Sequence, residues 1–209
     1  MIQQRLVSLG REALLANDGS LESTVISGQG GVPFGLPGET WPALNGEPLF
    51  PILTIATREL PVVPAFLSGN EYWAVFIQRD QYEQSVNDGS LVVRRYPRIS
   101  ELVPLPQPIG ASSKRLGLSF STVTDYPSGI ALRTMLGDDG DHEDLDARFP
   151  CHAGIKLGGW PLLVQGTAFL ATAEPDFQIQ LDVTDLYMYA DTGIGYVYGG
   201  LEAIIWDSM

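Results

Sequence analysis

The sequence predicts an α+β protein in which strands dominate and two similar halves make up the chain. Its 209 residues include 23 glycines and 15 prolines spread along the whole length, a composition that favours strands and turns over long helices. Apolar segments rich in aromatic and β-branched residues recur between these turns. The pattern Gly-Gly-x-Pro occurs twice, at 30–33 and at 158–161, each time ahead of an apolar segment. A chain of this length can bury a sizeable core, so we expect one compact domain over residues 1–209.

The first half, about residues 1–97, is expected to begin with a helix and to continue as strands. Apolar residues at helical spacing predict an amphipathic helix over 1–16, which ends at the turn 17–20. Strands are predicted at 23–27, 49–55, 71–77 and 90–96, where apolar, aromatic and β-branched residues gather. A connector with four prolines, residues 97–113, follows.

The second half, about residues 114–209, is expected to repeat this order. A strand is predicted at 116–123, and helical segments at 128–136 and 142–149 are interrupted by an acidic loop. After the second Gly-Gly-x-Pro, strands are predicted at 162–165, 176–182, 193–199 and 202–207. Because helix, strand, Gly-Gly-x-Pro and further strands follow in the same order in both halves, the sequence predicts an internal duplication.

Each Gly-Gly-x-Pro predicts a sharp corner that directs the chain back into a sheet. Glycine tolerates positive φ and close backbone approach, while proline fixes its own φ and holds the residue before it extended. We therefore assign a structural role to six residues: Gly30, Gly31, Pro33, Gly158, Gly159 and Pro161.

Several segments, taken in order, resemble one protein family. They are GGVPFGLPGETWP, GEPLFPILTI, KLGGWPLLVQ, FQIQLD, ADTGIGYVY and AIIWD, which cover most of the chain from about residue 23 onward. In this order they resemble the YwqG-like family of uncharacterised bacterial proteins. The resemblance implies a strand-dominated α+β fold with an internal repeat, and it brings no established reaction. In similar proteins the strand after the tryptophan-proline turn carries glutamine before isoleucine. The first copy here has Leu53-Thr54-Ile55 instead, whereas the second keeps Gln178 and Gln180.

Charge and composition exclude several classes of partner. The net charge is −13, from 12 basic against 25 acidic residues, and no basic stripe is present, so we expect no nucleic-acid binding. The acidic excess favours solubility and can also attract a basic protein partner. No apolar run is long enough to span a bilayer and the N-terminus lacks a signal-peptide pattern, so we expect a cytoplasmic protein without membrane contact. The single cysteine, Cys151, excludes an internal disulfide.

Three segments suggest catalysis or ligand binding but lack the pattern that each would need. Cys151 and His152 are neighbours whose side chains would point to opposite faces of an extended segment, so they cannot form a nucleophile–base pair. Residues 137–146 are dense in carboxylates but lack the alternating spacing of a calcium loop. The turn at 28–31 lacks the third glycine and the following helix of a dinucleotide site. We therefore expect no metal and no cofactor.

The segment 176–182 is the most suggestive candidate site. Its polar residues alternate with apolar ones, which gives a strand one polar and one apolar face. Exposed amides beside aromatic rings would line a cleft for a peptide or a polar ligand, although ordinary solvent-facing residues show the same alternation. The candidate binding residues are Gln178, Gln180 and Asp182 of this strand, together with Gln165, Trp41 and Trp160.

These patterns favour a non-catalytic protein that binds another protein or a peptide, including an inhibitor of a basic partner such as a toxin with nuclease character. Four aromatic residues are candidate anchors: Trp41, Trp160, Tyr72 and Trp73. The alternative is a small-molecule hydrolase that uses carboxylates of the second half, namely Asp182, Asp185 and Asp191. A purely structural oligomer is the third option.

Overall fold

The computed structural model describes residues 11–19, 26–78, 83–109, 115–136, 145, 147–162, 177–182, 193–198 and 202–208. Within these ranges strands dominate: one sheet has eleven strands and two small sheets have two strands each. In the same ranges, helix α2 (Gly129–Leu136) and short 3-10 helices accompany the strands. This content confirms the strand-rich α+β class. None of the described helices is long and apolar enough to cross a membrane.

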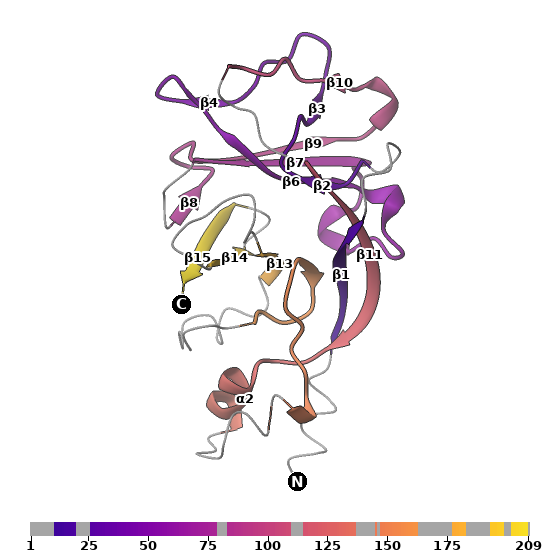
Figure 1. The fold of residues 1–209 in the computed structure, drawn as a ribbon, viewed down its shortest axis with the longest axis vertical. Helices are drawn as coiled ribbons and strands as arrows, with labels where there is room; N and C mark the ends of the chain where they lie inside the picture. The colour runs from indigo at the N-terminus through magenta and orange to yellow at the C-terminus, as the bar shows by residue number, and fades with distance from the viewer. Residues whose placement is uncertain are drawn as a thin grey trace.

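The large sheet is antiparallel, and its centre is a pair of long strands. Its order is β8 (Glu83–Ser85), β15 (Ala203–Ser208), β14 (Gly193–Tyr198), β13 (Phe177–Asp182), β12 (Lys156–Gly158), β1 (Arg11–Gly19), β11 (Leu116–Asp125), β2 (Gly28–Gln29), β6 (Phe50–Ala56), β7 (Tyr72–Ile77) and β9 (Leu91–Tyr96). β1 and β11 pair from Arg11 opposite Asp125 to Gly19 opposite Gly117. Figure 1 shows this pair as a long curved ribbon at one side of the molecule.

Each long strand lies beside strands of the other half of the chain. β1 comes from the first half and pairs with β12 of the second half, where Leu14 lies opposite Leu157. β11 comes from the second half and pairs with β2 of the first half, where Leu116 lies opposite Gln29. The sheet therefore contains two groups of strands, β2–β6–β7–β9 and β12–β13–β14–β15, on either side of an exchanged central pair.

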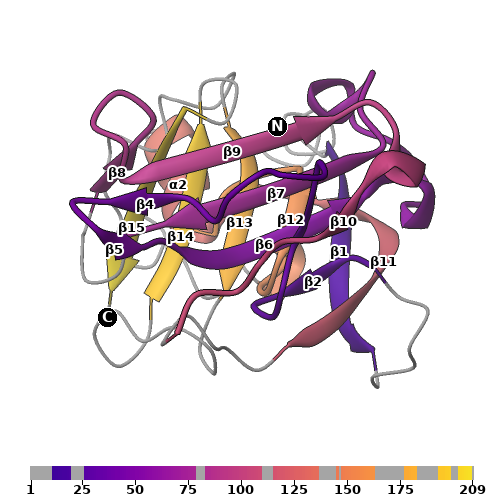
Figure 2. The same ribbon diagram turned by 90° about the horizontal axis from the view of Figure 1, so that it is seen from above.

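The main hydrophobic core lies between these two groups. The sheet curls so that the groups face each other, and from above their strands cross (Figures 1 and 2). Both halves contribute buried residues to the main core. Those of the first half are Phe50, Ile52, Leu53, Ile55, Leu60, Leu67, Trp73, Val75, Ile77 and Leu91, and those of the second are Leu118, Ile155, Leu157, Ile179, Leu181, Val197 and Ile204. Side chains of a strand alternate between faces, so Trp73, Val75 and Ile77 of β7 reach this core. Ile179 and Leu181 of β13 reach it for the same reason.

A second core covers the other face of β6, β7 and β9. The short strands β3 (Phe34–Gly35), β4 (Ala43–Leu44), β5 (Glu47–Pro48) and β10 (Val103–Pro104) form a layer above that face in Figure 1. The cluster that they cover contains Trp41, Leu49, Ala56, Tyr72, Ala74, Phe76, Tyr96 and Leu105. The ring of Trp41 lies 5.7 Å from that of Phe76, and its Nε1 donates to the Leu49 carbonyl at 2.8 Å. This layer comes from the first half and from the connector that follows it.

The first half also contributes a strand to the edge of the second. β8 pairs with β15, with Ile204 opposite Gln84, although β8 and β9 are consecutive strands of the first half. The backbone N–H of Val86 donates to the carbonyl of Glu202 at 3.0 Å, which extends this contact into the turn after β8. β8 and β9, the two edge strands of the large sheet, are therefore linked by one short turn.

Most strand predictions are confirmed, whereas the N-terminal helix prediction is wrong. The segments predicted at 49–55, 71–77, 90–96, 116–123, 176–182, 193–199 and 202–207 correspond to β6, β7, β9, β11, β13, β14 and β15, and the helix at 128–136 corresponds to α2. Residues 11–16 of that prediction, and residues 17–19 of the turn predicted after it, belong to β1 instead, because strands pair with both edges of this segment. Residues 1–10 lie outside the described residues. Tertiary pairing here overrides a local pattern that suited a helix.

The other segments discussed from the sequence lie only partly within the described residues. Residues 26–27 lie outside any strand, and β2 begins at Gly28; residues 23–25 lie outside the described ranges. The connector at 97–113 carries the 3-10 helix η3 (Ile99–Glu101) and β10, so its first part packs on the fold. Most of 137–146 and all of 163–165 lie outside the description.

Candidate functional site

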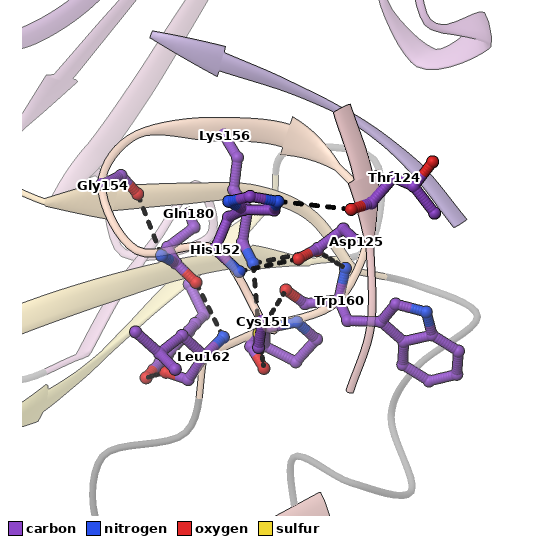
Figure 3. A network of polar contacts seen from close by, with 11 residues as sticks. Thr124, Asp125, Cys151, His152, Gly154, Lys156, Trp160, Leu162 and Gln180 are labelled. Carbon is purple, nitrogen blue, oxygen red and sulfur yellow. Dashed lines mark hydrogen bonds and ion pairs between the residues drawn. The ribbon is translucent and has the colours of Figure 1, made fainter. Parts of the chain in front are cut away.

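The second Gly-Gly corner encloses a cluster of buried polar side chains, drawn in Figure 3. Its centre is Asp125, the last residue of β11, which is fully buried. One carboxylate oxygen, Oδ1, accepts the backbone N–H of His152 at 2.8 Å. The other, Oδ2, accepts the N–H of Trp160 at 2.8 Å and the ammonium of Lys156 at 3.0 Å. A single carboxylate therefore ties β11 to the loop before β12 and to the corner after it.

Lys156 is buried because of its position in β12. Its neighbours Ile155 and Leu157 belong to the main core, and strand alternation turns Lys156 to the opposite face. Both side chains of the Lys156–Asp125 pair have no solvent exposure. Burying two charges is costly, and the backbone donors on Asp125 together with the ion pair offset that cost. The geometry suits a contact that fixes the corner in place.

Cys151 lies at the side of this pair. Its Sγ is 3.4 Å from Lys156 Nζ and lies within 3.6 and 3.7 Å of the carbonyls of Pro161 and Trp160. The imidazole of His152 does not reach the sulfur; its Nε2 lies 3.3 Å from the carbonyl of Thr124. The two neighbours thus make separate contacts.

Gln180 of β13 is buried as well, which contradicts the expectation of an exposed polar face. Its Nε2 donates to the Gly154 carbonyl at 2.9 Å, and its Oε1 accepts the N–H of Leu162 at 2.8 Å. Gln180 has no exposed area, and it lies opposite Lys156 and Tyr196 on the neighbouring strands. The strand is therefore covered on both faces at this point, and the amide supports the segment 154–162.

The other proposed site residues of the second half lie wholly or partly outside the described residues. Gln178 and Asp182 occupy positions in β13, and their side chains are not described. Gln165, Asp185 and Asp191 lie outside the described residues.

The proposed aromatic anchors are core residues. Their exposed fractions are 8% for Trp41, 2% for Trp160, 0% for Tyr72 and 2% for Trp73. The chain itself therefore covers these four rings. Burial of such large rings stabilises the fold instead.

The segment that leads into the first Gly-Gly corner is held in a comparable way. Both oxygens of the Glu59 carboxylate accept backbone N–H groups, from Ile26 at 2.8 Å and from Ser27 at 2.7 Å. The hydroxyl of Thr54 lies 3.2 Å from the carbonyls of Ile26 and of Gly28. Carboxylate and hydroxyl groups from other parts of the chain thus satisfy the backbone of residues 26–28, which lead into the corner.

The glycines of both corners have the conformation that the sequence predicts. Their φ angles are +62° at Gly30, +72° at Gly31, +77° at Gly158 and +77° at Gly159. Pro33 and Pro161 are buried directly after them. At Gly31 a Cβ would lie 2.7 Å from Cβ of Arg115, so the site requires glycine for space as well as for φ.

Sequence reasoning missed the charged residues that organise the corners: Asp125, Lys156 and Glu59. One signal was available, because Lys156 is one of only two lysines and sits between apolar residues in Ile155-Lys156-Leu157. A charged residue in such a setting is buried only when it is paired. Its partner lies 31 positions away, which no local pattern reveals.

Among the described residues, no group of three or more histidine, cysteine, aspartate and glutamate side chains could hold a metal ion. Comparison of the sequence with protein-family models gives no match, and comparison with curated proteins gives no significant match.

Proposed function

We propose that this chain is a non-catalytic binding module whose partner is a basic protein. The observation that carries the proposal is the closed state of the polar cluster. Asp125, Lys156 and Gln180 are fully buried, and each is engaged by backbone or side-chain groups of the chain itself. Catalytic groups need access to a substrate, and these three have none.

The charge of the surface supports a basic partner. The Lys156–Asp125 pair is neutral as a unit, so the net charge of −13 is carried by the rest of the chain. Complementary charge accelerates encounter and selects partners, while tight binding needs buried contacts in addition. An inhibitor of a basic protein, including an immunity-type protein that neutralises a toxin, fits this balance. We place it in the cytoplasm of a bacterium, in keeping with the YwqG-like resemblance.

Capture of the partner tests the proposal. The tagged chain is used as bait in its native cell extract at low and at physiological ionic strength, and captured proteins are identified by mass spectrometry. We expect a basic protein whose yield falls as salt rises, because exposed charges are screened. The variant Glu47→Lys with Glu202→Lys reverses two exposed charges and should reduce capture. The control variant Thr40→Gln with Asn87→Gln alters exposed neutral residues and should not.

Two results would contradict the proposal. Capture that is insensitive to salt and to the charge-reversal variant would remove the electrostatic argument. Turnover of a small molecule by the purified chain, lost on replacing Asp182, Asp185 and Asp191 by asparagine, would establish the hydrolase alternative.

We also propose that the chain arose by duplication. Gly28 of β2 pairs with Gly117 of β11 on one side and with Thr54 of β6 on the other. Lys156 of β12 pairs in the same way with Leu15 of β1 and with Gln180 of β13. In each half the Gly-Gly pair begins two residues after this doubly paired residue.

The hydrogen bonds of the two corners support the same correspondence. In the first half, Thr54 lies opposite Gly28, and its hydroxyl donates to the carbonyl of Ile26, two residues before Gly28. In the second half, Gln180 lies opposite Lys156, and its amide donates to the carbonyl of Gly154, two residues before Lys156. The strands that follow are β6, β7 and β9 in one half and β13, β14 and β15 in the other, each antiparallel to the next. A crystal structure in which the backbones around Gly28 and Lys156 do not superpose would contradict the duplication.

A further inference from the structure

The polar cluster at the second corner places a thiol and an amine in direct contact. Nζ of Lys156 donates to Sγ of Cys151 at 3.4 Å, and Figure 3 shows the two side chains meeting beside Asp125. Lys156 is the first residue of β12, and Cys151 lies in the segment before that strand. The fold therefore holds one of the chain's two lysines against its single cysteine.

The two groups differ in their access to solvent. Cys151 is partly exposed, whereas the side chain of Lys156 has no exposed area. Oxidation of cysteine follows solvent access, so a small oxidant such as hydrogen peroxide has a route to this residue. The amine that the oxidised sulfur then meets is the buried Lys156 next to it.

An amine attacks sulfur only after its nitrogen has given up a proton, and the cluster contains an acceptor for that proton. Oδ2 of Asp125 lies 3.0 Å from Nζ of Lys156. The backbone N–H groups of His152 and Trp160 donate to this carboxylate and hold it in place. Nζ thus contacts both the sulfur and a fixed proton acceptor.

We propose that Cys151 and Lys156 form a site of reversible oxidative modification, in which hydrogen peroxide leads to a sulfur–nitrogen bond between them. In the first step one peroxide oxygen is transferred to the thiol, which becomes a sulfenic acid, and the other oxygen leaves as water. In the second step a proton moves from the Lys156 ammonium to Asp125, and the neutral nitrogen attacks the sulfur. The S–O bond breaks as the S–N bond forms, and the hydroxide takes a further proton from nitrogen and leaves as water.

The product contains no buried charge, and thiols reverse its formation. Before oxidation Lys156 and Asp125 form an ion pair without solvent exposure; afterwards Asp125 holds the transferred proton and the nitrogen is neutral. Neither charge is left buried without its partner, which would be costly. An added thiol attacks the sulfur and releases the amine, and a second thiol then restores the cysteine. This proposal does not depend on the partner proposed above.

Peptide mapping of the full chain tests the cross-link. The folded protein is treated with hydrogen peroxide, the excess is destroyed with catalase, and the chain is unfolded and digested with trypsin without a reducing agent. Cleavage after Lys156 should be lost, because trypsin requires the cationic side chain. The peptide that spans Cys151 and Lys156 should be lighter by two hydrogen atoms than the same peptide without the bond. Dithiothreitol should restore both the mass and the cleavage.

Two variants and one change of condition serve as controls. Lys114→Arg replaces the other lysine and should leave the cross-link unchanged. Lys156→Arg keeps a positive charge but removes the amine, so Cys151 should gain only oxygen. Peroxide treatment of the original chain in urea tests the contact without any substitution. The unfolded chain should form far less cross-link, because the fold no longer holds Nζ against Sγ.

Three results would overturn the proposal. The first is a folded chain in which Cys151 is unchanged or carries only oxygen while trypsin still cleaves after Lys156. The second is equal cross-linking of the folded and the unfolded chain, since the contact in the fold would then play no part. The third is a cross-linked peptide that contains an additional oxygen, because the bridge would then not be a direct sulfur–nitrogen bond.

Discussion

At the scale of single residues, the buried pair of Lys156 and Asp125 makes a large energetic demand, because both charges are removed from water. Lys156→Met leaves a buried carboxylate without its cation, and we expect the free energy of unfolding to fall by about 3–5 kcal/mol. The double variant Lys156→Met with Asp125→Asn removes both charges and should lose less than the sum of the two single variants. Urea unfolding of the four proteins measures this coupling.

An exposed ion pair provides the matched control. Arg98 Nη1 lies 3.3 Å from Glu101 Oε1, and the two side chains are 73% and 54% exposed. Arg98→Ala should cost under about 1 kcal/mol, because water screens such pairs. A loss for Lys156→Met as small as that for Arg98→Ala would show that the buried pair does not stabilise the corner.

Glycine positions allow a second test at the residue scale. Gly31 and Gly38 both have positive φ, but a Cβ at Gly31 would meet the side chain of Arg115 whereas one at Gly38 would meet open space. Gly38→Ala should therefore cost about 1 kcal/mol from backbone strain alone, and Gly31→Ala should cost clearly more. Thermal unfolding of the two variants makes the comparison. Equal losses would mean that only φ, and not the close approach, requires glycine at Gly31.

Buried tyrosines make stability sensitive to alkaline pH. Burial raises the pKa of Tyr72 to about 12 from 10.0, although the N–H of Phe34 on its hydroxyl partly opposes the shift. Between these two pH values the unfolded chain has lost this proton and the folded chain has kept it, so stability decreases as pH rises through that window. Tyr72→Phe should make the decrease smaller. Urea titrations at stepwise pH measure it, and an unchanged slope in the variant would contradict the assignment.

At the scale of elements, the predictable strands are those with a local signal. The segment of β7 has apolar, aromatic and β-branched residues throughout, and all six of its residues are buried. β1 carries no such signal: it reads Arg-Glu-Ala-Leu-Leu-Ala-Asn-Asp-Gly, a sequence suited to a helix. It forms a strand because it pairs with β11, whose residues lie about a hundred positions away, and with β12. Asp125 is likewise hidden from the second corner, because it lies 31 positions before Lys156 and 35 before Trp160. The glycines of that corner, in contrast, are evident in the sequence.

The position of β1 between two strands leads to a prediction. Leu14 lies opposite Thr122 of β11 and opposite Leu157 of β12. Leu14→Pro removes a backbone N–H within a strand that pairs on both sides, and we expect it to destabilise the fold by roughly 3 kcal/mol or more. Gln107→Pro, between two prolines of the exposed connector, should be nearly neutral. If the N-terminal segment were a helix on the surface of the sheet, hydrogen exchange would not show the strong protection that we expect for residues 12–16.

At the scale of the whole molecule, the exchanged strands and the shared core predict that the two halves unfold together. A chain of two independent repeats would show two transitions, because each repeat would keep its own core. Here the main core takes Trp73 and Val75 from one half and Ile179 and Val197 from the other, so the loss of either half exposes the other. Calorimetry should give one transition whose van't Hoff and calorimetric enthalpies agree. Leu14→Pro should move this single transition to lower temperature without splitting it. Two resolved transitions, or a variant in which one half melts first, would show that the halves are separate domains joined by pairing alone.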